Sequence, residues 1–371
     1  MSLVVRGAIK DYDWGIVDGL ARWAGGATNG PQAELWYGIH PGGPSPLVDS
    51  QGHTTGDDLA RHFDVESIPL LVKLLAAAKP LSVQVHPNKS LAAQGYADQQ
   101  RGEELRRVYS DPFEKTELLV ALQDFEAFAG WRHQDEAIAF LSAIEALNAG
   151  LDLGAAKAEL AQGNFKAALP LLIEANTVQV VATLAAAAAA IGLDDAQVVA
   201  YEIVEKEYAD DAGALITPLL AYLSLGKGEA VFLPAGVPHS YIRGIGVEVM
   251  TSSDNVVRLG LTSKPVFVDH ALKAINDDLH PQVMRVHIGD LIWPVNAPFV
   301  VRLLESGSER MPTGAYRIAL AIEGKSSIVF EDAEITIRPG TAAVMSADDP
   351  DADVEAHGLV AVIQSTILTQ H

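Results

Sequence analysis

The stretch that decides the fold is Pro234-Ala235-Gly236-Val237-Pro238-His239. Proline and glycine favour a tight turn, and the mostly apolar run Glu229–Leu233 that precedes it is typical of a strand. A second short strand, His239–Tyr241, is expected to follow. The pattern therefore predicts two strands joined by a turn. His239 then either points inward as a metal ligand or is hydrogen-bonded to the nearby backbone.

A similar unit lies near the C-terminus, where Ala333–Ile337 leads into Arg338-Pro339-Gly340 without a following histidine. Many short strands separated by Gly, Pro, Ser and Asn are typical of a sandwich or a jelly-roll barrel. The Pro-x-Gly-x-x-His pattern also resembles the second sequence motif of the cupin barrels. We therefore expect a mainly β protein with two cupin-like jelly-roll barrels, a catalytic one from residues 1–130 and 226–285 and a non-catalytic one from residues 286–371.

Between these parts, residues 131–225 are rich in alanine and leucine at helical spacing, which predicts an α-helical insertion. Pro170 is expected to kink or break one of its helices. The expected helices are Gln134–Leu147, Ala155–Leu160, Phe165–Ala175, Val178–Ile191 and Asp195–Tyr208. Val178–Leu193 is the longest apolar run, but it is short for a membrane span and is interpreted as a core helix. With no signal-peptide pattern at the N-terminus, a cytoplasmic location is expected.

The composition excludes several classes of site and partner. The 371 residues include no cysteine, which rules out disulfides, iron–sulfur clusters, thiolate zinc sites and a thiol nucleophile. Any metal must be held by histidine, carboxylate, amide or water. With 26 Lys and Arg against 48 Asp and Glu, the formal net charge is −22. Such a charge repels nucleic acid and anionic membranes, so neither is expected as a partner.

Polar residues alternate with apolar ones along Leu81–His86, which predicts a strand that ends at Pro87. Ser82, Gln84 and His86 share one face of it. This face either supplies metal ligands, the glutamine through its carbonyl oxygen, or is simply a solvated outer face. Glu117 precedes the apolar run Leu118–Leu122 and begins a strand that offers either a further carboxylate ligand or a surface charge.

Several longer motifs, in order along the chain, resemble those of the type I mannose-6-phosphate isomerases. Together they span about Tyr12 to Lys264. They are Tyr12–Gly15, Ala33–Pro41, Pro69–Lys73, Pro80–Pro87, Leu233–Tyr241, Glu248–Met250 and Ser253–Lys264. One departure is Glu114-Lys115-Thr116-Glu117, where the family usually shows His-Lys-Pro-Glu.

The resemblance implies one zinc ion per chain and a sugar-phosphate substrate. Residue by residue, it implies zinc ligands at Gln84, His86, Glu117 and His239. It implies catalytic roles for Arg258, Lys115 and Asp254. It implies substrate and phosphate contacts at Lys73, Ser82 and Lys264, with pocket walls at Trp14, Tyr241 and Glu248. The implied reaction interconverts mannose 6-phosphate and fructose 6-phosphate by proton transfer through an enediol-like intermediate.

Other interpretations of the same residues stay open at this point. Lys73 could be a surface lysine, Asp254 and Arg258 a structural pair, and Trp14 part of the core. The main alternative function is a metal-binding cupin that binds or senses sugar phosphates without catalysis. An iron-dependent oxidative cupin is disfavoured by the glutamine in the implied ligand set. A monomer is expected.

The net charge gains a different meaning if the resemblance holds. Lys73, Lys115, Arg258 and Lys264 would gather in one cleft with a divalent metal, giving a local positive field within an acidic shell. The excess acid would then lie elsewhere, in segments such as Glu202–Asp211 and a solvated loop at Asp348–Glu355.

Overall fold

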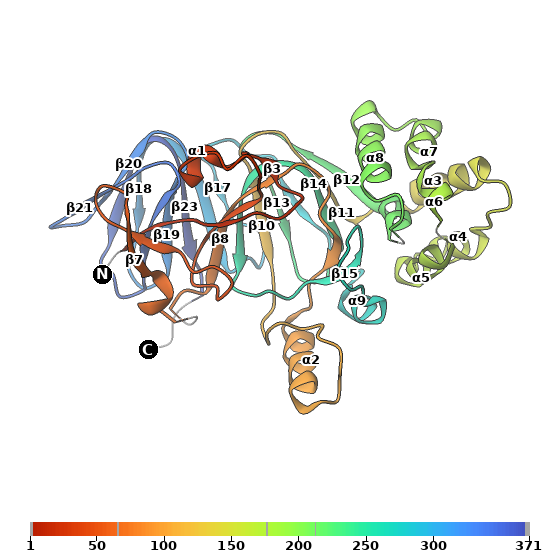
Figure 1. Cartoon of the computed structure of the whole chain (residues 1–371), viewed down its shortest axis with the longest axis horizontal. Coiled ribbons are helices and arrows are strands. Elements are labelled where there is room, and N and C mark those ends of the chain that lie inside the picture. The colour runs from red at the N-terminus through yellow and green to blue at the C-terminus, as the bar shows by residue number, and fades with distance from the viewer. Residues whose placement is uncertain (1–2, 65–66, 176, 212, 368–371) are drawn as a thin grey trace.

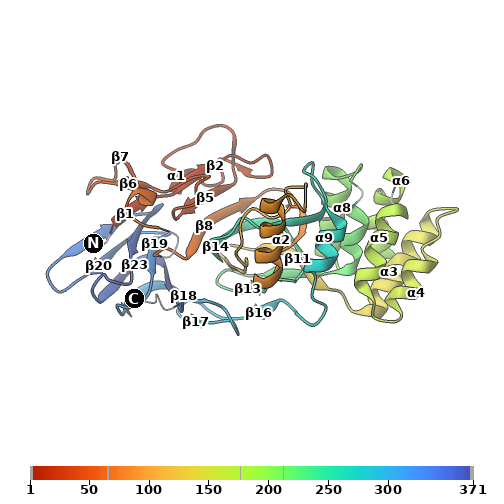
Figure 2. The same cartoon turned by 90° about the horizontal axis from the view of Figure 1, so that it is seen from below.

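The computed structural model describes residues 3–64, 67–175, 177–211 and 213–367. Two large sheets lie side by side, and a group of helices extends from one end (Figures 1 and 2). All strand pairs identified in these sheets are antiparallel. The mainly β architecture with a helical insertion that the sequence predicts is therefore observed.

The first sheet has eleven strands and carries the residues of the candidate site. Seven strands follow one path in the order β16 (Gln282–Met284), β13 (Ala230–Leu233), β10 (Glu117–Ala121), β14 (His239–Thr251), β8 (Leu70–Ala77), β5 (Glu34–Tyr37) and β2 (Ala8–Lys10). Four more continue from β14, namely β11 (Phe125–Trp131), β12 (Leu220–Leu225), β9 (Val83–Val85) and β15 (Val257–Gly260).

The strand after the Pro234–His239 turn is longer than its sequence predicts, because β14 runs unbroken from His239 to Thr251. Its first half pairs with β11 and its second half with β8 and β10. Gly244 lies at the change of partner with φ +132°, a conformation that favours glycine, and a Cβ there would come within 2.6 Å of Phe125. One continuous strand thus joins the part of the first sheet that contains β11 to the part that contains β8 and β10.

Side-chain alternation gives β8, β10 and β14 two different faces. Val72 and Leu74 of β8 point into the core between the sheets, together with Leu118 of β10 and Val249 of β14. The residues between them, including Lys73, point to the opposite side, where the candidate site lies. The same three strands therefore build the core with one face and the site with the other.

The second sheet has ten strands and takes in N-terminal segments as well as C-terminal ones. Its path is β17 (Leu291–Ile292), β18 (Phe299–Met311), β23 (Ala352–Ser365), β19 (Arg317–Ala321), β22 (Thr341–Met345), β1 (Leu3–Arg6), β6 (Pro46–Val48) and β7 (Thr54–Asp58). Outside this path, β20 (Lys325–Val329) pairs with β21 (Glu334–Ile337) and with β23. A separate pair joins β3 (Ile16–Val17) to β4 (Pro31–Gln32).

Two expectations about this region differ from the structure. Strand β1 pairs with β22, Leu3 opposite Val344, so part of residues 1–130 belongs to the sheet of the C-terminal strands. The segment Asp348–Glu355 is also not simply a solvated loop. Residues 352–355 begin β23, and Asp349 is buried, with its carboxylate accepting the N–H and hydroxyl of Ser346.

The helical insertion contains α3 (Gln134–Leu147), α4 (Gly154–Leu160), α5 (Phe165–Ala175), α6 (Val178–Val181), α7 (Leu184–Ala190) and α8 (Asp195–Glu207). Pro170 lies inside α5 without breaking it. The predicted single helix Val178–Ile191 is two helices instead. Thr183 separates them, since its hydroxyl donates to the carbonyl of Val180 and accepts from Asn148.

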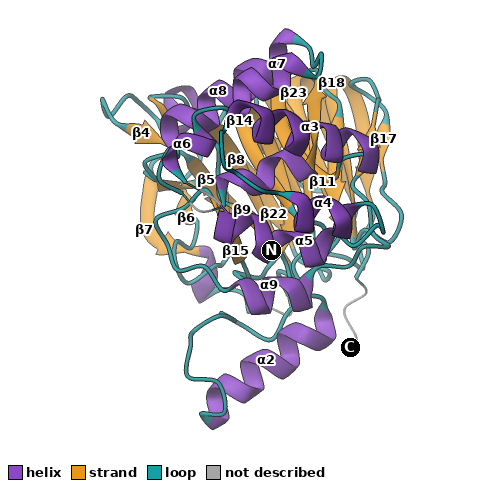
Figure 3. Ribbon diagram, turned by 90° about the vertical axis from the view of Figure 1, so that its right-hand side faces the viewer, coloured by secondary structure: helices purple, strands orange, loops and turns teal. Residues whose placement is uncertain are grey.

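The remaining helices are short or stand apart from this group. They are α1 (Ala21–Ala24), α2 (Lys89–Arg101), α9 (Val268–Ala274) and the 3₁₀ turns at Leu59–Arg61 and Ala214–Leu219. Helix α2 projects from the body of the molecule near α9 (Figure 3). None of the helices in the described part of the chain is long and apolar enough to cross a membrane.

Removing side-chain volume from the core between the sheets should destabilise the protein strongly. Leu74 is fully buried there, and we expect Leu74→Ala to lower the free energy of unfolding by about 2–5 kcal/mol. Leu105→Ala is the matched control, since Leu105 is 90% exposed and should change it by less than about 0.5 kcal/mol. Urea denaturation measures both, and equal losses would contradict this placement of the core.

Candidate metal centre and cavity

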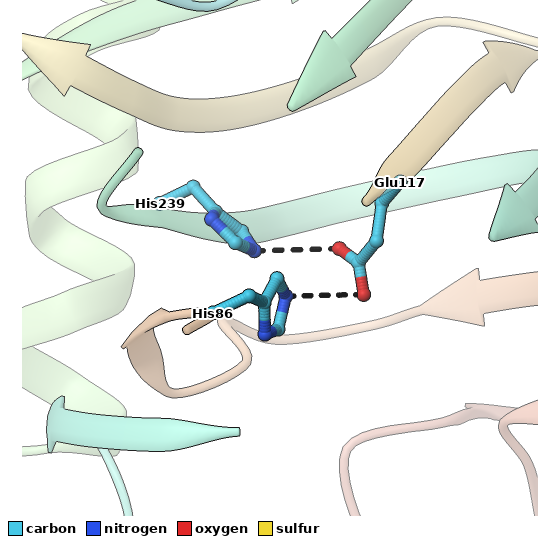
Figure 4. Close-up of side chains that lie close together, drawn as sticks. All are labelled: His86, Glu117 and His239. Carbon is cyan, nitrogen blue, oxygen red and sulfur yellow. Dashed lines mark ion pairs between the residues drawn. The ribbon is translucent and has the colours of Figure 1, made fainter. Parts of the chain in front are cut away.

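Three buried side chains from separate parts of the chain meet at one point (Figure 4). His86 follows β9, Glu117 is the first residue of β10, and His239 is the first residue of β14. Each ring faces a different oxygen of the carboxylate. The distance from His86 Nε2 to Glu117 Oε1 is 3.2 Å, and that from His239 Nε2 to Glu117 Oε2 is 3.4 Å.

Backbone carbonyls determine which nitrogen of each ring carries the proton. Nδ1 of His86 lies 2.7 Å from the carbonyl oxygen of Asn255, and Nδ1 of His239 lies 2.9 Å from that of Val237. Because a carbonyl can only accept, both Nδ1 atoms must donate. Burial also lowers the pKa of His86 to about 4, so its ring is neutral at physiological pH. With Nδ1 as the donor, the neutral form of each ring has its lone pair on Nε2, which faces Glu117.

This arrangement fits a divalent cation. His86 Nε2 and Glu117 Oε2 are buried without a hydrogen-bond partner, which is costly unless a positive charge lies between them. Ligands held about 2.0–2.1 Å from a tetrahedral zinc lie roughly 3.3–3.4 Å apart, close to the spacing observed here. The donor set of two imidazoles and a carboxylate is also one that zinc accepts.

Gln84 lies beside this cluster, but its amide nitrogen faces it. In the strand register Gln84 is opposite both His239 of β14 and Arg258 of β15, so the three lie in one row. Its Nε2 is 3.3 Å from His239 Nε2, while its Oε1 accepts from the hydroxyl of Ser82 at 3.0 Å. A half turn of the amide would exchange the two atoms and present the oxygen to a metal.

The segment that departs from the family pattern still brings its two charged residues to the site. Lys115 Nζ lies 2.9 Å from Glu117 Oε1, and both side chains are buried. Burial alone would raise the pKa of Glu117, but the positive charge of Lys115 lowers it well below its usual value, so the carboxylate stays ionised. The hydroxyl of Thr251 accepts the N–H of Thr116 and donates to the carbonyl of Glu114, holding this segment in place.

A cavity of about 910 Å³ opens next to the cluster. Of the residues predicted for the site, only His86 and His239 are not on its lining. The lining includes Trp14, Lys73, Ser82, Gln84, Lys115, Glu117, Tyr241, Glu248, Asp254, Arg258 and Lys264. Lys73, Lys115, Arg258 and Lys264 therefore do gather in one cleft.

The positive charge of Lys73 is already paired with carboxylates of the protein. Its Nζ lies 2.8 Å from Glu248 and 3.4 Å from Glu34, and all three side chains are buried. Burial would lower the pKa of Lys73, but the two carboxylates outweigh it and raise the pKa. Glu34 also accepts the indole N–H of Trp36 at 2.7 Å. Sequence reasoning missed Glu34 and Trp36, although alternation within a quoted motif places both on one strand face.

Arg258 and Lys264, in contrast, have no carboxylate within ion-pair distance among the described residues. Burial lowers the pKa of both, and for Lys264 the nearby Arg258 lowers it further. Two cations that repel each other in a cleft would be stabilised by an anion.

Asp254 does not pair with Arg258. It lies 2.9 Å from His40, which sequence reasoning also missed. Burial alone would raise the pKa of Asp254, but His40 lowers it.

Two of the aromatic residues predicted for the site, Trp14 and Tyr241, also line the cavity. Trp14 is half-buried and stacks on Tyr12, with ring centroids 5.6 Å apart. Tyr241 is buried, and burial raises its pKa well above the usual value, so its phenol keeps its proton.

The prediction that the segment Glu202–Asp211 lies away from the cleft is wrong, since Glu207, Asp210 and Asp211 line it. The chain returns from α8 to the first sheet along this side of the cavity.

Comparison with known proteins agrees with this geometry. Residues 3–134 match the model for the catalytic domain of type I phosphomannose isomerase. The mannose-6-phosphate isomerase of Schizosaccharomyces pombe is 32% identical over 69% of each chain, and that of Homo sapiens is 30% identical over 71% of this chain and 69% of its own. The chain belongs to the type I phosphomannose isomerase family. It is an isomerase.

Solved structures extend the likeness over the whole chain. A mannose 6-phosphate isomerase described as the zinc-bound holo form superimposes with a TM-score of 0.80 at 25% identity, covering 99% of this chain and 100% of its own. A lysine-to-alanine mutant of the Salmonella typhimurium phosphomannose isomerase gives a TM-score of 0.82 at 25% identity with the same coverage. These two solved relatives therefore share the overall fold of this chain over nearly all of its length.

Removing the charge of Lys73 should be costly, because it would leave two buried carboxylates facing each other. We expect Lys73→Met to lower the free energy of unfolding by about 3–5 kcal/mol at neutral pH. Burial already raises the pKa of Glu248, and losing Lys73 would raise it further. The carboxyl would then take up a proton on folding, so the deficit should be smaller at about pH 5 than at about pH 8.

Lys79→Met is the control for this experiment. Lys79 is partly exposed and pairs with Asp13 and Glu207 at the surface, so its loss should cost less than about 1 kcal/mol. Denaturation curves at the two pH values measure both variants. A Lys73→Met deficit no larger than that of the control would contradict the buried ion pair.

Proposed function

We propose that this chain is a zinc-dependent mannose-6-phosphate isomerase that interconverts mannose 6-phosphate and fructose 6-phosphate. The observation that carries the proposal is the cluster of His86, Glu117 and His239, whose lone pairs converge beside a cavity that also holds Arg258 and Lys264. Relatives named mannose-6-phosphate isomerase occur in bacteria, plants and animals, and one solved relative is described as zinc-bound.

The proposed zinc ligands are Gln84, His86, Glu117 and His239. The two histidines and the glutamate have their lone pairs directed for this role, and Gln84 would join through its carbonyl oxygen after a turn of its amide. When bound, zinc supplies a positive charge that stabilises negative charge developing on the oxygens of the open-chain sugar. Glu117 offsets part of the charge of the metal, and Lys115 orients one oxygen of that carboxylate.

The substrate phosphate is proposed to bind near Arg258 and Lys264. These two cations line the cavity without carboxylate partners in the described segments, whereas Lys73 is already paired with Glu34 and Glu248. Lys73 and Ser82 are therefore assigned to the sugar hydroxyls rather than to the phosphate. Trp14 and Tyr241 offer apolar walls with polar tips, which suits a sugar ring.

The reaction requires removal of the proton on C2 of the aldose and delivery of a proton to C1, with an enediol-like intermediate between the two steps. Removing a proton beside a carbonyl needs a base and stabilisation of the oxyanion. We assign the proton transfer to Lys115 or Asp254. Asp254 is ionised, because His40 lowers its pKa, and can accept a proton. Arg258 keeps its proton and stabilises negative charge.

The domain organisation is part of the proposal. We assign catalysis to the unit formed by the eleven-stranded sheet, as the first of two cupin-like jelly-roll barrels. The sheet built mainly from residues 286–371 is assigned a structural role, because it packs on the face of β8, β10 and β14 that points away from the cavity. Residues 131–225 form the insertion that contributes one side of the cavity.

Metal removal tests the proposal directly. Dialysis against a chelator should abolish formation of fructose 6-phosphate from mannose 6-phosphate in a coupled assay, and added zinc should restore it, because the charge at the sugar oxygens is lost and regained. Full activity in metal-free protein would exclude the metal role. Substrate binding without turnover in the zinc-loaded protein would instead favour the non-catalytic sugar-phosphate binder.

Arg258→Ala should reduce kcat/KM by roughly 100- to 1,000-fold, because it removes a charge directed at the phosphate or the transition state. Arg243→Ala is the matched control. Arg243 pairs with Glu126 and is not on the cavity lining, so this variant should keep near-normal kinetics. Steady-state kinetics of both variants decide the assignment, and near-normal turnover of Arg258→Ala would refute it.

A further inference from the structure

Asn255 is a fully buried residue to which the proposed reaction gives no task. It lies between β14 and β15, three residues before Arg258. Its backbone carbonyl accepts the Nδ1–H of His86 at 2.7 Å, which sets both the tautomer and the direction of that ring. Asn255 is therefore in direct contact with one of the proposed metal ligands.

The side chain of Asn255 points to a different segment, the loop that leads into Lys115 and Glu117. Its Nδ2 donates to the backbone carbonyls of Asp111 and Phe113, both at 2.8 Å. Its Oδ1 accepts the backbone N–H of Ser110, also at 2.8 Å. The amide thus uses both its donors and its acceptor to bind one loop. Few side chains could replace it without leaving buried polar groups unpaired.

Asp111, which belongs to this loop, binds in turn the two residues that precede Asn255. Its carboxylate accepts the hydroxyl of Ser253 and the backbone N–H of Asp254, both at 2.8 Å. The residues on the N-terminal side of Asn255 are therefore tied to the same loop as its side chain. The position of the carbonyl that binds His86 is consequently coupled to the position of the loop that precedes Glu117.

We infer that Asn255 is a positioning residue that sets the separation of His86 and Glu117 for metal binding, by bonding the first with its backbone and the loop of the second with its side chain. This inference rests on the proposed function, since it takes these two residues as zinc ligands. Groups that orient metal ligands in this way typically change metal affinity by about 10- to 100-fold.

A purely structural role is the alternative, and the chain offers a matched control for it. Gln99 of α2 also uses its amide to bind a loop backbone. Its Oε1 accepts from Val108 and Tyr109 at 2.7 and 2.8 Å, and its Nε2 donates to Tyr109 at 2.7 Å. Gln99 thus holds the residues just before the loop that Asn255 holds. The hydrogen bonds of its side chain go to Val108 and Tyr109, not to His86 or Glu117.

The test compares Asn255→Asp with Gln99→Glu in the full-length chain. Each substitution keeps the shape of the side chain but replaces a donor by an acceptor, so each should lower the Tm of the metal-free protein. Competition with a chromophoric chelator measures the zinc dissociation constant. We expect Asn255→Asp to weaken zinc binding by about 10- to 100-fold and Gln99→Glu to change it by less than about threefold.

Asn255→Ser removes the amide without adding a charge, and we expect it to weaken zinc binding by about 10- to 100-fold as well; it decides the question if Asn255→Asp does not fold. Unchanged zinc affinity in the Asn255 variants overturns the inference. Equal loss in Gln99→Glu also overturns it, because general order of the loop would then set the affinity. A wild-type chain that binds no zinc would refute the proposed function itself, so the two failures are distinguishable.

Discussion

The structure depends on one geometric constraint, the alternation of side chains along three neighbouring strands. In β8, β10 and the second half of β14 every second residue enters the core shared with the second sheet, and the residues between them point to the opposite side, where Lys73, Glu117 and Glu248 line the cavity. Shifting β8 by one residue would exchange Leu74 for Lys73 in an apolar core. Packing against the second sheet therefore fixes the register that brings Lys73, Glu117 and Glu248 to the site. This gives the second sheet a role in the site although it contributes no proposed ligand.

Charge is organised around the same constraint. The chain has a net charge of −22, yet the cavity lining includes Arg258 and Lys264, which have no carboxylate within ion-pair distance in the described part of the chain. Three acidic residues of the lining have other partners. Glu34 and Glu248 contact Lys73, and Asp254 contacts His40. Pairing of these negative charges, rather than their exclusion from the cleft, leaves Arg258 and Lys264 available to an anion.

Much of the candidate site could be predicted because its residues lie in short local sequence patterns. The alternation in Leu81–His86 and the turn before His239 predicted the strands, and β10 begins at Glu117 as expected. The partners Glu34, His40 and Asn255 were harder to find. They act through contacts with residues distant in sequence, such as the carbonyl of Asn255 that binds His86. The division of Val178–Ile191 was missed because it depends on the side-chain bonds of one threonine.

By itself, the sequence determined the mainly β class, the helical insertion and the residue types able to hold a metal without thiolates. These follow from periodicity, turn chemistry and the absence of cysteine, which are local or compositional properties. Only the tertiary structure decided that β1 joins the C-terminal sheet, that Lys73 is neutralised, and that Glu207, Asp210 and Asp211 line the cavity. The physical reason is that strand partners, burial and ion pairs depend on which distant segments meet, and no local pattern specifies that.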